Sequence, residues 1–94
     1  MFTKDELMVY YDSLNESEKL IISNLIEELL FMYKKCEECK SKPFLDENGK
    51  STGAYQVYKT LNASVNNISK VLINSARQIE DDKANELLAK LSEF

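Results

Sequence analysis

The stretch from residue 53 to residue 78, GAYQVYKTLNASVNNISKVLINSARQ, decides the fold class of this 94-residue chain. Apolar and small residues recur in it at alternating steps of four and three positions, the period of one face of an α-helix. The series consists of Ala54, Tyr58, Leu61, Val65, Ile68, Leu72, Ser75 and Ile79. We therefore predict a long helix over about residues 53–78, capped by Ser51 or Thr52.

A second series with the same period precedes the first. It consists of Ile22, Leu25, Leu29, Met32, Cys36 and Cys39. This series predicts a helix over about residues 15–41, begun by the capping box Ser13-Leu14-Asn15-Glu16. Pro43 ends that helix, because the residue before a proline is pushed out of helical geometry.

The loop at residues 43–52 joins the two long helices and contains the tight-turn pair Asn48-Gly49. Two long helices joined by a short loop form an antiparallel hairpin. Phe44 and Leu45 are apolar residues within this polar loop, and we expect them to fold back on a helix end.

Short helices flank the hairpin. The capping box Thr3-Lys4-Asp5-Glu6 predicts one over about residues 4–12, and a second is expected over about residues 82–93. The apolar face of the second consists of Leu87, Leu88, Leu91 and Phe94. Residues 1–94 are thus expected to form a single all-α domain, a long antiparallel helical hairpin with short flanking helices.

Several apolar residues lie off the two strict seams of the hairpin. They are Tyr10, Tyr11, Tyr55, Val57, Val71 and Ile73. Either the short helices cover them or another copy of the chain does, and small domains commonly gain burial by oligomerisation. We expect a homo-oligomer whose fold and contacts depend on the seam residues Leu25, Leu29, Met32, Leu61, Val65, Ile68 and Leu72.

The composition argues against an enzyme. The chain has no histidine, which excludes Ser-His-Asp and Cys-His catalysis and His-containing zinc sites. It also lacks the glycine-rich loops that bind nucleotides. No nucleophile, base and oxyanion donor can be assembled from its residues. We therefore expect a non-enzymatic protein with no cofactor and no metal of its own.

Cys36 and Cys39 form the one motif with the spacing of a metal or redox site. Both lie on the apolar seam of a predicted helix, where a cysteine behaves as a small hydrophobe. A metal shared by the cysteines of two copies is the alternative. The N-terminus shows no signal-peptide pattern, and the apolar run at residues 29–33 is far too short to span a membrane. We expect a cytoplasmic protein.

Charge is unevenly distributed along the chain, whose formal net charge is −4. Six lysines lie among four acids at residues 34–59, and Lys34, Lys35, Lys40 and Lys42 are the candidates for contact with nucleic acid. The alternative is a solvated face of mixed charge. Residues 1–33 are acidic, and their carboxylates are expected on solvated helix faces. Asn66, Asn67 and Asn74 lie in the second long helix and are either solvent-exposed or hydrogen-bonded at a helix contact.

The chain resembles the phage terminase small-subunit family, among the short helical proteins of Gram-positive phages and prophages. The resemblance covers roughly residues 20–94 and depends on Lys42-Pro43-Phe44, the helix start Ser51-Thr52-Gly53-Ala54 and the pair Tyr58-Lys59. Family members commonly have Thr-Pro-Ala at that helix start, whereas this chain has Gly53 in place of the proline.

The resemblance implies a DNA-packaging accessory in the cytoplasm of a bacterial host. Such proteins recognise the phage genome, form rings through helical hairpins and regulate the terminase large subunit. Residues 1–14 form at most one helix of a DNA-reading helix-turn-helix, so oligomerisation and partner binding are the expected role. The alternative is a small acidic inhibitor or adaptor of a mobile element that binds a host or phage protein.

Overall fold

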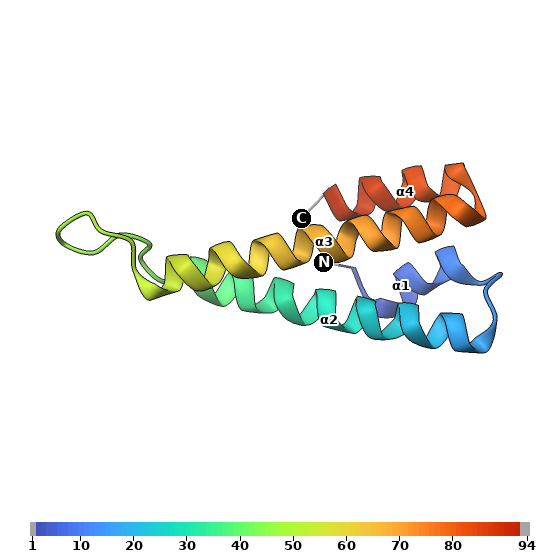
Figure 1. Cartoon of the computed structure of the whole chain (residues 1–94), viewed down its shortest axis with the longest axis horizontal. Helices are drawn as coiled ribbons and strands as arrows, with labels where there is room; N and C mark the ends of the chain where they lie inside the picture. Colours follow the sequence, from blue (N-terminus) through green and yellow to red (C-terminus); the bar gives the residue numbers. More distant parts are fainter. Residues whose placement is uncertain (1, 93–94) are drawn as a thin grey trace.

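A computed structural model describes residues 2–92 and confirms the all-α class (Figure 1). The elements are helix α1 (Lys4–Met8), the 3-10 helix η1 (Val9–Tyr11) and helices α2 (Glu16–Lys40), α3 (Gly53–Ile79) and α4 (Asp81–Ser92). Helices α2 and α3 form the long antiparallel hairpin, and the molecule measures 53 × 23 × 19 Å.

The starts of the helices are set by side-chain caps. Thr3 accepts a hydrogen bond from the backbone N–H of Glu6, and Thr52 accepts one from that of Tyr55, both at 3.3 Å. The cap of α2 is Asn15, whose side chain accepts from the N–H of Glu18 at 2.9 Å. The predicted box begun by Ser13 is wrong, because the chain is still turning at Ser13 and becomes helical only after Asn15.

Two other bounds differ from the sequence-based expectation. The single helix expected over residues 4–12 is α1 followed by the tighter turn of η1, which ends at Tyr11. Helix α4 covers residues 81–92, because extended backbone at Glu80 ends α3 and lets a new helix begin at once. Residues 93 and 94, which were assigned to that segment and its apolar face, lie outside the described residues.

The hairpin loop is an ordered structure. The Asp46 carboxylate accepts from the backbone N–H groups of Asn48 and Lys50 at 2.8 and 2.9 Å. Gly49 has φ +76°, a conformation that favours glycine, so the Asn-Gly pair makes the turn that its sequence predicts.

The two apolar loop residues have different environments. Phe44 packs on Tyr55 and Tyr58 with ring centroids 5.6 and 5.2 Å apart, as expected. Leu45 does not fold back and is 61% exposed, because its backbone pairs with Ser51 in an isolated bridge.

Helices α1 and α4 and the turn η1 pack on one half of the hairpin, which we call the base (Figure 1). The largest fully buried side chains lie there: Leu7, Tyr11, Ile26, Leu29, Leu72 and Leu87. Where α4 stops, the hairpin projects as a two-helix stalk that ends in the loop (Figure 1), and we define the stalk as residues 34–68. Five helical segments thus build the core, and two helices carry the tip.

Tyr11 connects the short segments to the hairpin, a role that periodicity alone did not reveal. Its buried hydroxyl donates to the backbone carbonyl of Leu72 at 2.7 Å, across 61 positions of sequence. Burial raises the pKa of the Tyr11 hydroxyl above its ordinary value of 10.0. The neutral, donating form is therefore the one that the fold stabilises.

Replacing Tyr11 by phenylalanine should lower the free energy of unfolding at pH 7 by about 1 kcal/mol, because one buried hydrogen bond is lost. The stabilisation from the raised pKa of Tyr11 is fully present below the unfolded pKa of about 10 and is lost as pH rises above it. Urea unfolding should therefore show a gap between the wild type and Tyr11→Phe that shrinks from pH 8 to about pH 11. A gap of constant size over that range would contradict this account.

Candidate interaction surface

Helix α3 has an unusual distribution of charge. Its 27 residues include only three charged ones, Lys59, Lys70 and Arg77, in a chain in which 30% of residues are charged. The spacing of these three, 11 and 7 residues, places them along one line of the helix. The surface of α3 on the side away from that line is uncharged.

The uncharged side of α3 adjoins an apolar edge of α2, and we call the two together the open face. On α2 it contains the apolar residues Ile21, Leu25 and Met32, with the charged residues Glu28 and Lys35 on the same line. On α3 it contains Val57, Leu61, Ser64, Ile68, Val71, Ser75 and Gln78. The heptad spacing within each set places its members along one line of the helix. At the base, the open face has a depression of about 360 Å³ lined by residues of both helices, among them Ile21, Ser75 and Gln78.

The short helices pack elsewhere on the hairpin. Lys4 of α1 bonds Glu27 of α2 at 2.7 Å, and Lys90 of α4 lies 3.9 Å from Glu6 and 5.9 Å from the ring centre of Tyr10. Helix α4 therefore packs beside α1 and η1. The sequence left open whether the short helices or another copy of the chain cover the off-seam residues. Tyr10 and Tyr11 are buried in the base, whereas Val57 and Val71 are 52% and 49% exposed.

The seven seam residues also divide into two sets. Leu29, Val65 and Leu72 are buried in the core. Leu25, Met32, Leu61 and Ile68 are only partly buried, and they lie on the open face. Three of the seven seam residues are therefore buried in the core, and the other four pack against it and also present apolar surface beside Ile21, Val57 and Val71.

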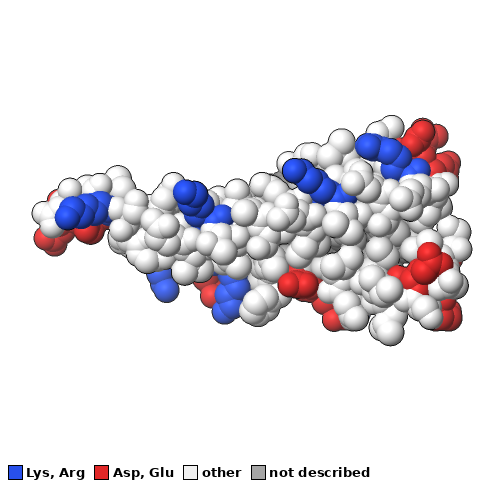
Figure 2. Space-filling view, viewed as in Figure 1, with Lys and Arg blue, Asp and Glu red and all other residues white. Residues whose placement is uncertain are grey.

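The four candidate lysines lie on the stalk but do not share one face. Lys34 and Lys35 are neighbours in α2, so their side chains diverge by about 100°. Lys35 pairs with Glu38 at 3.2 Å, and Lys40 pairs with Glu37 at 3.4 Å and lies over the ring of Tyr58. Lys42 follows the end of α2 and is exposed. The lysines encircle the stalk and are partly neutralised by neighbouring acids (Figure 2).

The far end of the molecule from the tip is acidic. The start of α2 and the connection before it carry Asp12, Glu16 and Glu18, and the turn from α3 to α4 carries Glu80, Asp81 and Asp82. Both turns lie at the same end of the molecule (Figure 1), and acidic side chains gather there in Figure 2. We call this cluster of six residues the acidic end.

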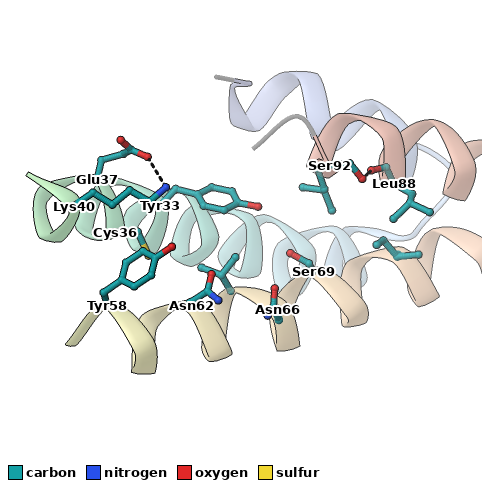
Figure 3. A pocket seen from close by; sticks show the side chains of 13 residues that line it. Tyr33, Cys36, Glu37, Lys40, Tyr58, Asn62, Asn66, Ser69, Leu88 and Ser92 are labelled. Carbon is teal, nitrogen blue, oxygen red and sulfur yellow. Dashed lines mark hydrogen bonds and ion pairs between the residues drawn. The ribbon is translucent and has the colours of Figure 1, made fainter. Parts of the chain in front are cut away.

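A groove of about 270 Å³ lies where α4 stops and the stalk begins (Figure 3). Its apolar lining includes Val65, Ile73, Leu88 and Leu91. Asn62, Asn66 and Ser69 supply amide and hydroxyl groups. The ion pair between Glu37 and Lys40 lies on its rim. These groups can hydrogen-bond a polypeptide.

Cys36 and Cys39 lie one turn apart at the end of α2, with Cys36 buried and Cys39 partly buried. Burial raises the pKa of the Cys36 thiol, and the neighbouring Cys39 adds to the effect. A raised pKa disfavours the thiolate that attacks or binds a metal. Within residues 2–92, no three Cys, Asp or Glu side chains lie close enough to hold a metal ion. The geometry therefore favours the packing role of Cys36.

Comparisons of the chain with models of protein families, with curated protein sequences and with solved structures found no match. Among the helices in residues 2–92, none has an apolar stretch long enough to cross a bilayer. The open face, the stalk lysines and the acidic end are thus the features from which a function must be inferred.

The two thiols should differ in reactivity. The variant Cys36→Ala keeps only the partly buried Cys39, and Cys39→Ser keeps only the buried Cys36. In the folded chain, iodoacetamide should modify Cys39 in the first variant about tenfold faster than Cys36 in the second, because Cys36 is buried and its pKa is raised. Mass spectrometry over time gives both rates, and the same variants in urea are the control, where the rates should converge. Protection of both thiols by added zinc would instead favour the shared metal.

Proposed function

We propose that this chain is a non-enzymatic assembly protein that binds macromolecules along its α2–α3 hairpin, as a phage terminase small subunit does. The observation that supports this is the composition of the open face. Depletion of charge, together with partly exposed apolar side chains, distinguishes the centre of a protein interface from ordinary surface. A long helix exposed only to water would carry charged residues there, as α2 does on its outer side.

DNA contact is the second part of the proposal. The lysines encircle the stalk, so one chain can direct only one or two of them at a given duplex. Affinity for DNA would then depend on several copies that bind together, since linked weak contacts raise overall affinity greatly. The proposed partners are other copies of the chain, the terminase large subunit and duplex DNA.

Light scattering with and without a short duplex, at low and moderate salt, tests the proposal. We expect a mass above that of one chain, DNA binding at low salt, and weaker binding as salt is raised, because phosphate contacts release counterions. Changing Lys34, Lys35, Lys40 and Lys42 to glutamate should abolish DNA binding, and light scattering of the variant without DNA measures separately any change in the protein's own assembly.

The matched control changes the same number of cations outside this set, with Lys19, Lys70, Arg77 and Lys83 replaced by glutamate. It alters net charge equally, so retained binding by the control would locate the contact on the stalk. An equal loss of DNA binding in both variants would show that binding depends on the net charge of the protein and not on the stalk lysines. Unchanged affinity of the stalk variant at low salt would remove the DNA part of the proposal.

The acidic end favours a second candidate function, that of an acidic adaptor or inhibitor of a mobile element. Six carboxylates from two turns create a field that attracts a basic protein surface and repels phosphate. Salt-sensitive binding to a basic protein, lost when Glu80, Asp81 and Asp82 become glutamine or asparagine, would favour this function. The support would be strongest if the same protein did not bind duplex DNA.

A further inference from the structure

The open face leaves apolar surface on the one side of the hairpin that the short helices do not cover. Val9 in η1, Leu20 and Phe31 in α2, Leu45 in the loop and Leu88 in α4 are also exposed. Val57 and Val71 differ from them in that they lie two heptads apart on one uncharged line of α3, with Ser64 between them. Leu61 and Ile68 flank that line and are partly buried. An apolar row bordered by serine and asparagine suits a second helix packed closely against α3.

The size of the open face matches a stable interface. Helix α3 has 27 residues and is therefore about 40 Å long, and two helices about 10 Å apart make a face about 20 Å wide. The product, about 800 Å², is the area that each partner contributes to an interface of standard size.

The charge distribution selects both the partner and its direction. The acidic end and the lysine-bearing stalk lie at opposite ends of the same molecule. A second copy laid antiparallel on the open face places each acidic end near the other chain's stalk, whose six lysines outnumber its four acids, so regions of opposite net charge meet at both ends. A parallel copy would bring like charges together, which is unfavourable.

We infer that the open face binds a second copy of this chain in an antiparallel, two-fold symmetric pair, an inference that deepens the assembly role proposed above. The two-fold axis lies in the contact plane, across the helices, so α3 packs on α3 of the partner and α2 on α2 of the partner. The pair buries Ile21, Val57 and Val71 and makes a four-helix bundle of two stacked hairpin layers.

The sequence fixes a register for this pair. With the axis near Ile68, Val71 of one chain meets the small Ser64 position of the other, and Leu61 meets the Ser75 position, so large residues face small ones. On α2 the same register places Glu28 opposite Lys35 of the second copy. In this register large residues of one copy face small residues of the other, and an acid faces a base. A surface that pairs with itself needs such self-complementarity.

The first test is Val71→Glu, with Val9→Glu as the matched control. Both are half-exposed valines, so neither change should unfold the monomer, and circular dichroism checks this. Analytical ultracentrifugation should show a dimer for the wild type and the control. It should also show a dissociation constant raised about 100-fold or more for Val71→Glu, which buries two unpaired charges at the contact.

Disulfide trapping tests the direction of packing in a background with Cys36→Ala and Cys39→Ser. Ile68→Cys should form a disulfide with its own copy. Gln78→Cys should not, because antiparallel copies of that position lie about 30 Å apart, far beyond disulfide reach. A mixture of Val57→Cys and Gln78→Cys chains should form the mixed disulfide. Efficient self-linking of Gln78→Cys would overturn the antiparallel arrangement.

A wild type that is monomeric at about 100 μM, above the micromolar range of weak interfaces of this size, would overturn the inference. So would a dimer that Val71→Glu leaves intact. An assembly that forms through another surface, is unaffected by Val71→Glu and still binds duplex DNA would overturn the pair and leave the proposed function standing, so the two can fail separately. A stable dimer that ignores DNA would support the pair and remove the DNA contact.

Discussion

The structure depends on one constraint. The apolar stripe of each long helix is wider than the contact between the two helices, so the hairpin alone cannot bury the apolar residues on either side of that contact. Helices α2 and α3 bury Leu29, Val65 and Leu72 between them or beneath the short segments. One flank is completed by α1, η1 and α4, anchored through the hydroxyl of Tyr11 on the carbonyl of Leu72. The other flank is the open face, where Leu61 and Ile68 are covered only in part. The position of the short helices thus determines both the core and the surface left for a partner.

Separation of charge along the molecule follows from the same arrangement. Glu16 and Glu18 lie in the first turn of α2, and Asp81 and Asp82 lie in that of α4, where the helix dipole stabilises carboxylates. Since both helices begin at the same end of the molecule, their acids gather there. The lysines lie toward the other end, on the stalk and around the loop. Local rules of helix capping therefore produce a molecule with an acidic end and a basic stalk, and this polarity distinguishes parallel from antiparallel pairing.

The fold could be predicted from the sequence because the heptad series at residues 54–79 is nearly free of conflicting signals. The caps at Thr3 and Thr52 follow equally simple rules. Asn15 was missed because Ser13 also fits a capping box, and only the packing of η1 decides between them. The spatial arrangement of the lysines was not predictable from their clustering, because neighbouring helical residues diverge. The uncharged side of α3 could have been predicted from the spacing of Lys59, Lys70 and Arg77. These are the charged residues of α3, and their spacing places all three on one side of the helix.

The symmetry of the contact bears on the size of any assembly. An antiparallel two-fold pair uses the same surface on both chains, so it closes at two copies and cannot by itself form a ring. A larger assembly would need a second surface on each chain. The groove beside Asn62 and Asn66 and the ordered loop with its exposed Leu45 both lie off the open face. Because the pair carries one loop at each end, contacts made there would link pairs in succession. Growth beyond a dimer would then depend on the loop and groove, and formation of the dimer on the open face.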